Sequence, residues 1–101
     1  EDMALWHVGL MEQEILSEKS QSIMYAQHVN ENEEGYFYGY GWSIMPRDGK
    51  EPLIWHNGLS FFGTAEYWRL PQSGIMIFVA SHKTEVSAWD VAHAIYTVLE
   101  H

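Results

Sequence analysis

The stretch Trp55-His56-Asn57-Gly58-Leu59 is predicted to be the central strand of a sheet. Segments on both sides of it are rich in aromatic and β-branched residues and are separated by turn signals, which is the composition of paired strands. These segments are residues 36–45, 64–70 and 74–80. The histidine, the polar residue and the glycine predict that the central strand stops at a functional site. A strand histidine is also common as a structural residue, so its surroundings must distinguish the two roles.

Turn residues between the segments predict hairpins. Asp48-Gly49 is a strong hairpin signal just before the central stretch. Pro71-Gln72-Ser73-Gly74 joins the next two segments in the same way. Short turns connect antiparallel strands, so the sequence predicts an antiparallel sheet of three to four strands that pair in chain order.

Helical patterns lie before and after these strands. Residues 2–11 carry apolar residues mostly at helical spacing, and Ser17 is a predicted N-cap of a second helix that runs to about Ala26. Thr84 is the predicted N-cap of a final helix. That helix places four apolar residues on one stripe: Ala88, Val91, Ala92 and Ile95. The predicted fold class is therefore α+β, with a C-terminal helix on one face of the sheet and two short N-terminal helices.

Composition excludes several classes of protein. The 101 residues suffice for one domain. Five Lys and Arg residues against 14 acidic residues give a formal charge of −9, which argues against nucleic acid as a partner. No apolar run approaches the roughly 18 residues that span a membrane, and the absence of cysteine leaves the redox compartment open. No metal site is predicted, because no two histidines have i, i+4 spacing; those considered are His7, His28, His56, His82 and His93.

The two ends of the chain predict a fragment of a longer protein. The sequence starts with Glu1 and ends with Leu99-Glu100-His101, which matches the beginning of a vector-encoded polyhistidine tag. Residues 99–101 are therefore predicted to be expression-tag residues without a functional role.

An aromatic stretch precedes the central strand. In an extended strand, alternate residues share a face, which places on one face Tyr36, Tyr38, Tyr40 and Trp42. Phe37, Gly39 and Gly41 share the opposite face. One interpretation is an aromatic platform that binds carbohydrate or peptide. The other is that the aromatic rings fill a core while the glycines let a second element approach closely.

Taken together, the motifs resemble the C-terminal third of the serine β-lactamase and penicillin-binding-protein family, in the branch of class C β-lactamases, D-alanyl-D-alanine carboxypeptidases and esterases. Four features carry the resemblance: Asp2-Met3-Ala4-Leu5-Trp6, Tyr38-Gly39-Tyr40-Gly41-Trp42, His56-Asn57-Gly58, and Tyr67-Trp68-Arg69-Leu70-Pro71 followed by residues 74–81. The resemblance implies an incomplete part of a β-lactamase-like fold, with residues 1–98 as the C-terminal fragment of a serine hydrolase domain.

The same resemblance assigns roles to the central strand. His56 would be the acid-base or electrostatic group, and the backbone N–H of Leu59 would be one of two oxyanion-hole donors. Asn57, Gly58 and Ser60 would contact the substrate. Gly58 leaves room for the substrate beside the strand. Asn57 stands where the family has Ser or Thr, so an amide replaces a hydroxyl group.

The nucleophile of that family is absent from this sequence. None of the lysines lies in Ser-x-x-Lys, and none of the asparagines lies in Tyr-x-Asn. The segment Gly58-Leu59-Ser60-Phe61-Phe62 also lacks the final glycine of a Gly-x-Ser-x-Gly elbow. The isolated chain is therefore predicted to be inactive, and the alternative function is a small non-catalytic binding module that uses the Tyr36–Trp42 aromatic face.

The resemblance also predicts partners. They are the N-terminal part of the same domain and a small acyl substrate; no cofactor is expected, and relatives of this kind are often exported. Without that N-terminal part, the strand over residues 75–81 would keep an unpaired apolar edge. Such an edge predicts a homodimer in which two copies of this strand pair antiparallel.

Overall fold

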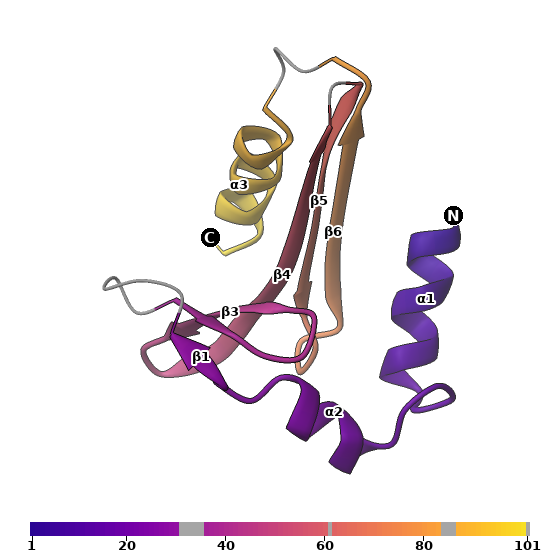
Figure 1. The fold of residues 1–101 in the computed structure, drawn as a ribbon, viewed down its shortest axis with the longest axis vertical. Coiled ribbons are helices and arrows are strands. Elements are labelled where there is room, and N and C mark those ends of the chain that lie inside the picture. Colours follow the sequence, from indigo (N-terminus) through magenta and orange to yellow (C-terminus); the bar gives the residue numbers. More distant parts are fainter. Residues whose placement is uncertain (31–35, 61, 84–86, 101) are drawn as a thin grey trace.

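The computed structural model describes residues 1–30, 36–60, 62–83 and 87–100. They form a six-stranded antiparallel sheet in chain order, with α3 against one face and α1 on the opposite side (Figure 1). The helices are α1 (Asp2–Met11), α2 (Glu18–Met24) and α3 (Ala88–Leu99). The strands are β1 (Val29–Asn30), β2 (Phe37–Tyr38), β3 (Ser43–Arg47), β4 (Lys50–Ser60), β5 (Gly63–Leu70) and β6 (Ile75–Ser81). No helix in these ranges is long and apolar enough to cross a membrane.

The predicted α+β class is confirmed, but the sheet has six strands where three to four were predicted. The segment 36–45 is not one strand, because it forms β2, a turn and β3. Gly41 lies in this turn with a φ of +81°, and the N–H of Gly39 donates to the carbonyl of Trp42 at 2.8 Å. Strands of two residues, such as β1 and β2, are too short to show a period in the sequence.

Both predicted hairpin turns are confirmed. Gly49 and Gly74 have φ values of +68° and +72°, which only glycine adopts at little cost. The central strand continues past Gly58. β4 pairs with β5 from Ile54↔Arg69 to Ser60↔Gly63, because an extended glycine does not by itself end a strand.

The final helix starts later than predicted. Its N-cap is Ser87, whose hydroxyl accepts a hydrogen bond from the backbone N–H of Asp90 at 3.2 Å; the predicted cap, Thr84, lies outside the described residues. Two members of the predicted apolar stripe, Val91 and Ile95, are each 40% exposed. The buried residues of α3, Ala88 and Ala92, are spaced by four, and Tyr96, four residues further on, packs against the core cluster of the sheet.

Alternation along the strands divides the core between the two faces of the sheet. The face under α3 has a buried cluster made of Leu53, Trp68, Leu70, Ile77 and Ala92. The opposite face has a second cluster made of Trp42, Ile44, Ile54 and Tyr67, with Met3 of α1 and Met24 of α2 packed against it. The neighbours Tyr67 and Trp68 therefore point to opposite faces, and each anchors one cluster.

A buried arginine joins the N-terminal helices to the sheet. Arg69 is fully buried; its Nε donates to His7 Nδ1 at 3.1 Å and its Nη1 donates to the hydroxyl of Tyr25. His7 Nδ1 accepts, so the proton of the neutral ring lies on Nε2, which donates to the carbonyl of Gly74 at 3.3 Å. Burial lowers the pKa of His7, and the Arg69 charge adds to this effect, while the Gly74 hydrogen bond opposes it. α1 thus docks on β5 through a neutral histidine.

The end of the chain also contacts the sheet. Glu100, one of the predicted tag residues, accepts hydrogen bonds from Arg47 at 2.8 Å and from Lys50 at 2.9 Å. Both cations flank the β3–β4 turn, so the last described residue is linked to that hairpin. His101 lies outside the described residues.

Candidate functional site

The central strand has an edge without a strand neighbour. β3 pairs with β4 only as far as Ser43↔Trp55, whereas β4 continues to Ser60 along β5. Figure 1 shows β4 extending well beyond β3. From His56 to Ser60, no strand among the described residues lies on the side of β4 opposite β5. Such an edge can bind an extended ligand through main-chain hydrogen bonds.

His56 is exposed beside this edge and is held by two hydrogen bonds. Its Nδ1 lies 2.8 Å from the carbonyl oxygen of Asn57, which can only accept, so Nδ1 donates. In the neutral ring, Nε2 then accepts from the hydroxyl of Tyr38 at 3.1 Å. The ring therefore has a defined tautomer. Sequence reasoning placed Tyr38 on an aromatic face and missed this contact, because the partner is 18 residues away on another strand.

Gly58 lies on an open part of β4. A Cβ atom built on Gly58 would have no atom of the described structure within 4 Å. Gly63 gives the contrast, because a Cβ there would lie 2.5 Å from the carbonyl oxygen of Ser81. The fold therefore needs a glycine at position 63 but has no steric need for one at position 58.

Asn57 and Leu59 project to the other face of the sheet from His56, because successive side chains alternate. They line a cavity of about 400 Å³ near the start of α3. Its lining residues are Asn57, Gly58, Leu59, Thr64, Glu66, Ser87, Ala88 and Trp89. The side chains of His56 and Asn57 thus lie on opposite faces of the sheet, and a ligand along the edge would contact both sides.

Ser60 lies where β4 passes into the next hairpin. Its Oγ accepts from the backbone N–H of Phe62 at 3.1 Å and lies 3.5 Å from the carbonyl oxygen of Gly63. The hydroxyl therefore stabilises the turn. All five predicted site residues lie along the open edge of β4, with Ser60 at its end, and Asn57, Gly58 and Leu59 also line the cavity.

Glu66 is a site residue that the sequence analysis missed. It pairs with Asn57 across the β4–β5 ladder, and only 5% of its surface is exposed. Its Oε1 accepts from Trp68 Nε1 at 2.8 Å. Burial raises the pKa of Glu66, while the Trp68 hydrogen bond and the His56 charge lower it. The available signal was an acidic residue within the predicted strand over residues 64–70.

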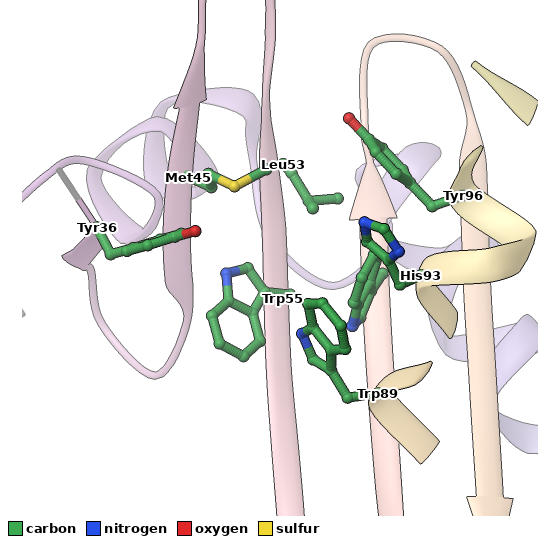
Figure 2. Close-up of a pocket in the computed structure, with 8 residues that line it drawn as sticks. Tyr36, Met45, Leu53, Trp55, Trp89, His93 and Tyr96 are labelled. Atoms are coloured by element: carbon green, nitrogen blue, oxygen red, sulfur yellow. The ribbon is translucent and has the colours of Figure 1, made fainter. Parts of the chain in front are cut away.

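A larger cavity of about 500 Å³ lies between the sheet and α3 (Figure 2). It is mostly aromatic and is lined by Tyr36, Met45, Leu53, Trp55, Trp68, Trp89, His93 and Tyr96. Of the predicted aromatic platform, only Tyr36 lines this cavity. Tyr40 stacks on His28 with a centroid separation of 4.0 Å, and Trp42 is buried against Tyr67. The four aromatics do not share a face, because the turn at Gly41 interrupts the strand.

Metal-binding groups do not come together in the described ranges. Within them, no three His, Asp or Glu side chains are grouped so that they could hold a metal ion. The groups that the edge of β4 offers to a ligand are the His56 imidazole, the Asn57 amide and main-chain N–H and C=O groups.

Comparison with known proteins identifies a similar fold. No protein-family model matches the sequence, and no curated protein matches it. The crystal structure of a penicillin-binding protein from Bacillus halodurans superposes with a TM-score of 0.82 and 28% sequence identity over 95% of this chain. This chain spans only 28% of that protein. The predicted resemblance is thus confirmed for the fold, which is that of part of a penicillin-binding protein.

Proposed function

We propose that this chain is the C-terminal part of a β-lactamase-like serine hydrolase domain and forms one wall of its active site. The observation that carries the proposal is the open edge of β4, where a Cβ at Gly58 would meet no neighbouring atom of the residues that the structure describes. The likeness to a penicillin-binding protein over 95% of the chain supports it. The glycine leaves space beside the backbone of this edge that the fold itself does not use, and a substrate could lie against the strand there.

In the proposed mechanism, the acyl group of the substrate lies along β4 next to Gly58. The Leu59 N–H stabilises the oxyanion of the tetrahedral intermediate, a contribution of roughly 3–4 kcal/mol for one donor in known hydrolases. His56 exchanges a proton through Nε2, the nitrogen that accepts from Tyr38. The Asn57 amide contacts the substrate from the other face. The attacking serine would come from a part of the protein outside this chain, since the sequence has no Ser-x-x-Lys.

Replacing the histidine tests this function directly. In the full-length protein, His56→Ala is expected to lower the acylation rate by roughly 10²-fold or more, the usual scale for a positioned acid-base group. The measurement is single-turnover acylation with nitrocefin and p-nitrophenyl acetate. The matched control is His82→Ala, because His82 is exposed outside the strand edge and should leave the rate unchanged.

The isolated chain is a second control. It is expected to hydrolyse neither reagent, because it lacks the nucleophile. An unchanged acylation rate in the full-length His56→Ala protein would overturn the assignment of this strand as a wall of the active site. Turnover by the isolated chain above its own His56→Ala variant would overturn the proposed external nucleophile.

A second candidate function is a non-catalytic binding module. It is favoured by the aromatic cavity of Figure 2, whose lining of indole and phenol rings suits carbohydrate or peptide ligands. This cavity would replace the Tyr36–Trp42 face as the binding surface. The full reading frame discriminates the two functions: Ser-x-x-Lys and Tyr-x-Asn motifs upstream support the hydrolase, whereas their absence supports the binding module.

We also propose that the isolated chain dimerises through β6. Among the described strands, β6 pairs only with β5, and Phe78 on this strand is 45% exposed. Ala80→Lys places a charge on an exposed position of the edge and is expected to convert the dimer to a monomer. Light scattering at high concentration measures the mass, and Gln27→Lys, far along the chain from β6, is the control. A monomeric wild-type chain would contradict the proposal.

A further inference from the structure

The cavity beside Asn57 differs from the aromatic cavity in carrying a carboxylate. Its lining comprises the acid Glu66, the amide of Asn57, two hydroxyl residues, the indole of Trp89 and three small or aliphatic residues, within about 400 Å³. Among the described residues, no lysine or arginine belongs to this lining. The full sequence carries a formal charge of −9, so the surrounding field attracts cations.

Glu66 is buried without a permanent counter-ion. Its described hydrogen bond comes from the neutral indole N–H of Trp68 at 2.8 Å, and no lysine or arginine in the described ranges forms an ion pair with it. Buried carboxylates are costly unless they are paired, and burial accordingly raises the pKa of Glu66. A bound cation would stabilise the ionised form of this side chain.

The neighbours of Glu66 suit a cation with several N–H donors. Asn57 is its direct cross-strand partner, so the amide and carboxyl side chains lie side by side on one face of the sheet, and both residues line the cavity. Trp89 is 45% exposed, and its indole provides an aromatic surface at the same cavity. A primary ammonium group could donate to the two oxygens while the indole contacts the attached carbon atoms.

The start of α3, which also borders the cavity, would by itself favour an anion. Two features reduce that preference. The Ser87 hydroxyl accepts from the N–H of Asp90 at 3.2 Å, and the Asp90 carboxylate lies in the first turn of the helix. With Glu66 in the same lining, an entering carboxylate would meet like charge.

We propose that this cavity binds a primary ammonium group through Glu66, Asn57 and Trp89. Because the cavity adjoins Gly58 and Leu59, it would select acyl substrates that carry an amino group. This role in substrate selection rests on the proposed hydrolase function, whereas binding itself does not. Glu66 is then a specificity residue of the site.

The first experiment is an NMR titration of the 101-residue chain with benzylammonium, benzyl alcohol and benzoate, which differ chiefly in charge. The Trp89 indole N–H and the Asn57 amide report binding. Benzylammonium is expected to bind at least tenfold more tightly than benzyl alcohol, and benzoate more weakly than both. Glu66→Gln should remove the advantage of benzylammonium, and Glu14→Gln, which removes an exposed acid near α1, should retain it. Equal affinity for the three ligands, or tightest binding of benzoate, would overturn the proposal.

A second measurement does not depend on the variant. Glu66→Gln keeps an oxygen that can accept from the Trp68 N–H. If this variant nevertheless fails to fold, a titration of the wild-type chain still tests whether the ligand binds at Glu66. The carbon-13 shift of the Glu66 carboxyl group is followed against pH, and benzylammonium is expected to lower its pKa. An unchanged pKa under saturating ligand would contradict binding at Glu66. Neither measurement involves catalysis. A failure to bind benzylammonium would therefore leave the His56 prediction untouched, and an unchanged acylation rate in His56→Ala would leave the ammonium site untouched.

Discussion

Gly58→Val in the full-length protein is expected to lower acylation by more than roughly 10²-fold, because displacing a substrate by about 1 Å already costs that much. The valine side chain would occupy the space beside β4 that the substrate needs. In the described part of the chain this space is open, since a Cβ at Gly58 would have no atom within 4 Å apart from its chain neighbours. Valine also favours extended backbone, so the strand itself should tolerate it.

The stability of the 101-residue chain distinguishes a loss of substrate binding from a loss of folding. Gly58→Val should change its free energy of unfolding by no more than about 0.5 kcal/mol, as for other exposed positions. Urea denaturation measures this value, and Gly58→Ala, with a smaller side chain, should give a smaller loss of acylation. Wild-type acylation by Gly58→Val would show that the substrate does not lie against β4. A large loss of stability would instead assign a structural role to the glycine.

Trp68→Ala is expected to have the largest effect on stability, a loss of about 3–5 kcal/mol in the free energy of unfolding. Trp68 is 3% exposed and belongs to the core cluster under α3. Its ring makes edge contacts with Trp89 and Tyr96 at centroid distances of 6.2 and 5.7 Å. Its N–H also satisfies the buried Glu66 carboxylate. Truncation would create a cavity and remove that hydrogen bond.

Urea denaturation of the isolated chain is again the measurement. The control is Phe62→Ala, a similar truncation of an aromatic residue that is 83% exposed, which should cost no more than about 0.5 kcal/mol. A loss below about 1 kcal/mol for Trp68→Ala would show that α3 is not held on the sheet through this side chain.

Local patterns predicted much of the architecture. The turns at Gly49 and Gly74 and the N-cap Ser17 follow from preferences of a few adjacent residues, and all three are confirmed. The strands shorter than three residues were missed, because two residues carry no period. The helical stripe of α3 was partly wrong, because the apolar residues on that helix extend beyond the face that packs on the sheet. Val91 and Ile95 are apolar, yet both are exposed.

For the candidate site, the sequence predicted which residues share a strand but not which residues they contact. The position of His56, Asn57, Gly58 and Leu59 on one strand followed from the sequence alone, because neighbouring residues in a strand alternate between its faces. The partners of these residues depended on strand register. Tyr38 reaches His56, and Glu66 lies opposite Asn57, only because β2, β3, β4 and β5 pair with the observed offsets.

The sequence by itself determined the fold class, the chain-order pairing of the predicted strands and the placement of residues 55–59 on a strand, because turn preferences and alternation act between neighbouring residues. Only the tertiary structure decided which residues surround that stretch. It buried Glu66, opened the space at Gly58 and placed Trp89 of α3 beside the cavity. These features arise from contacts between residues far apart in the chain, and their free energies depend on desolvation and packing that no local pattern records.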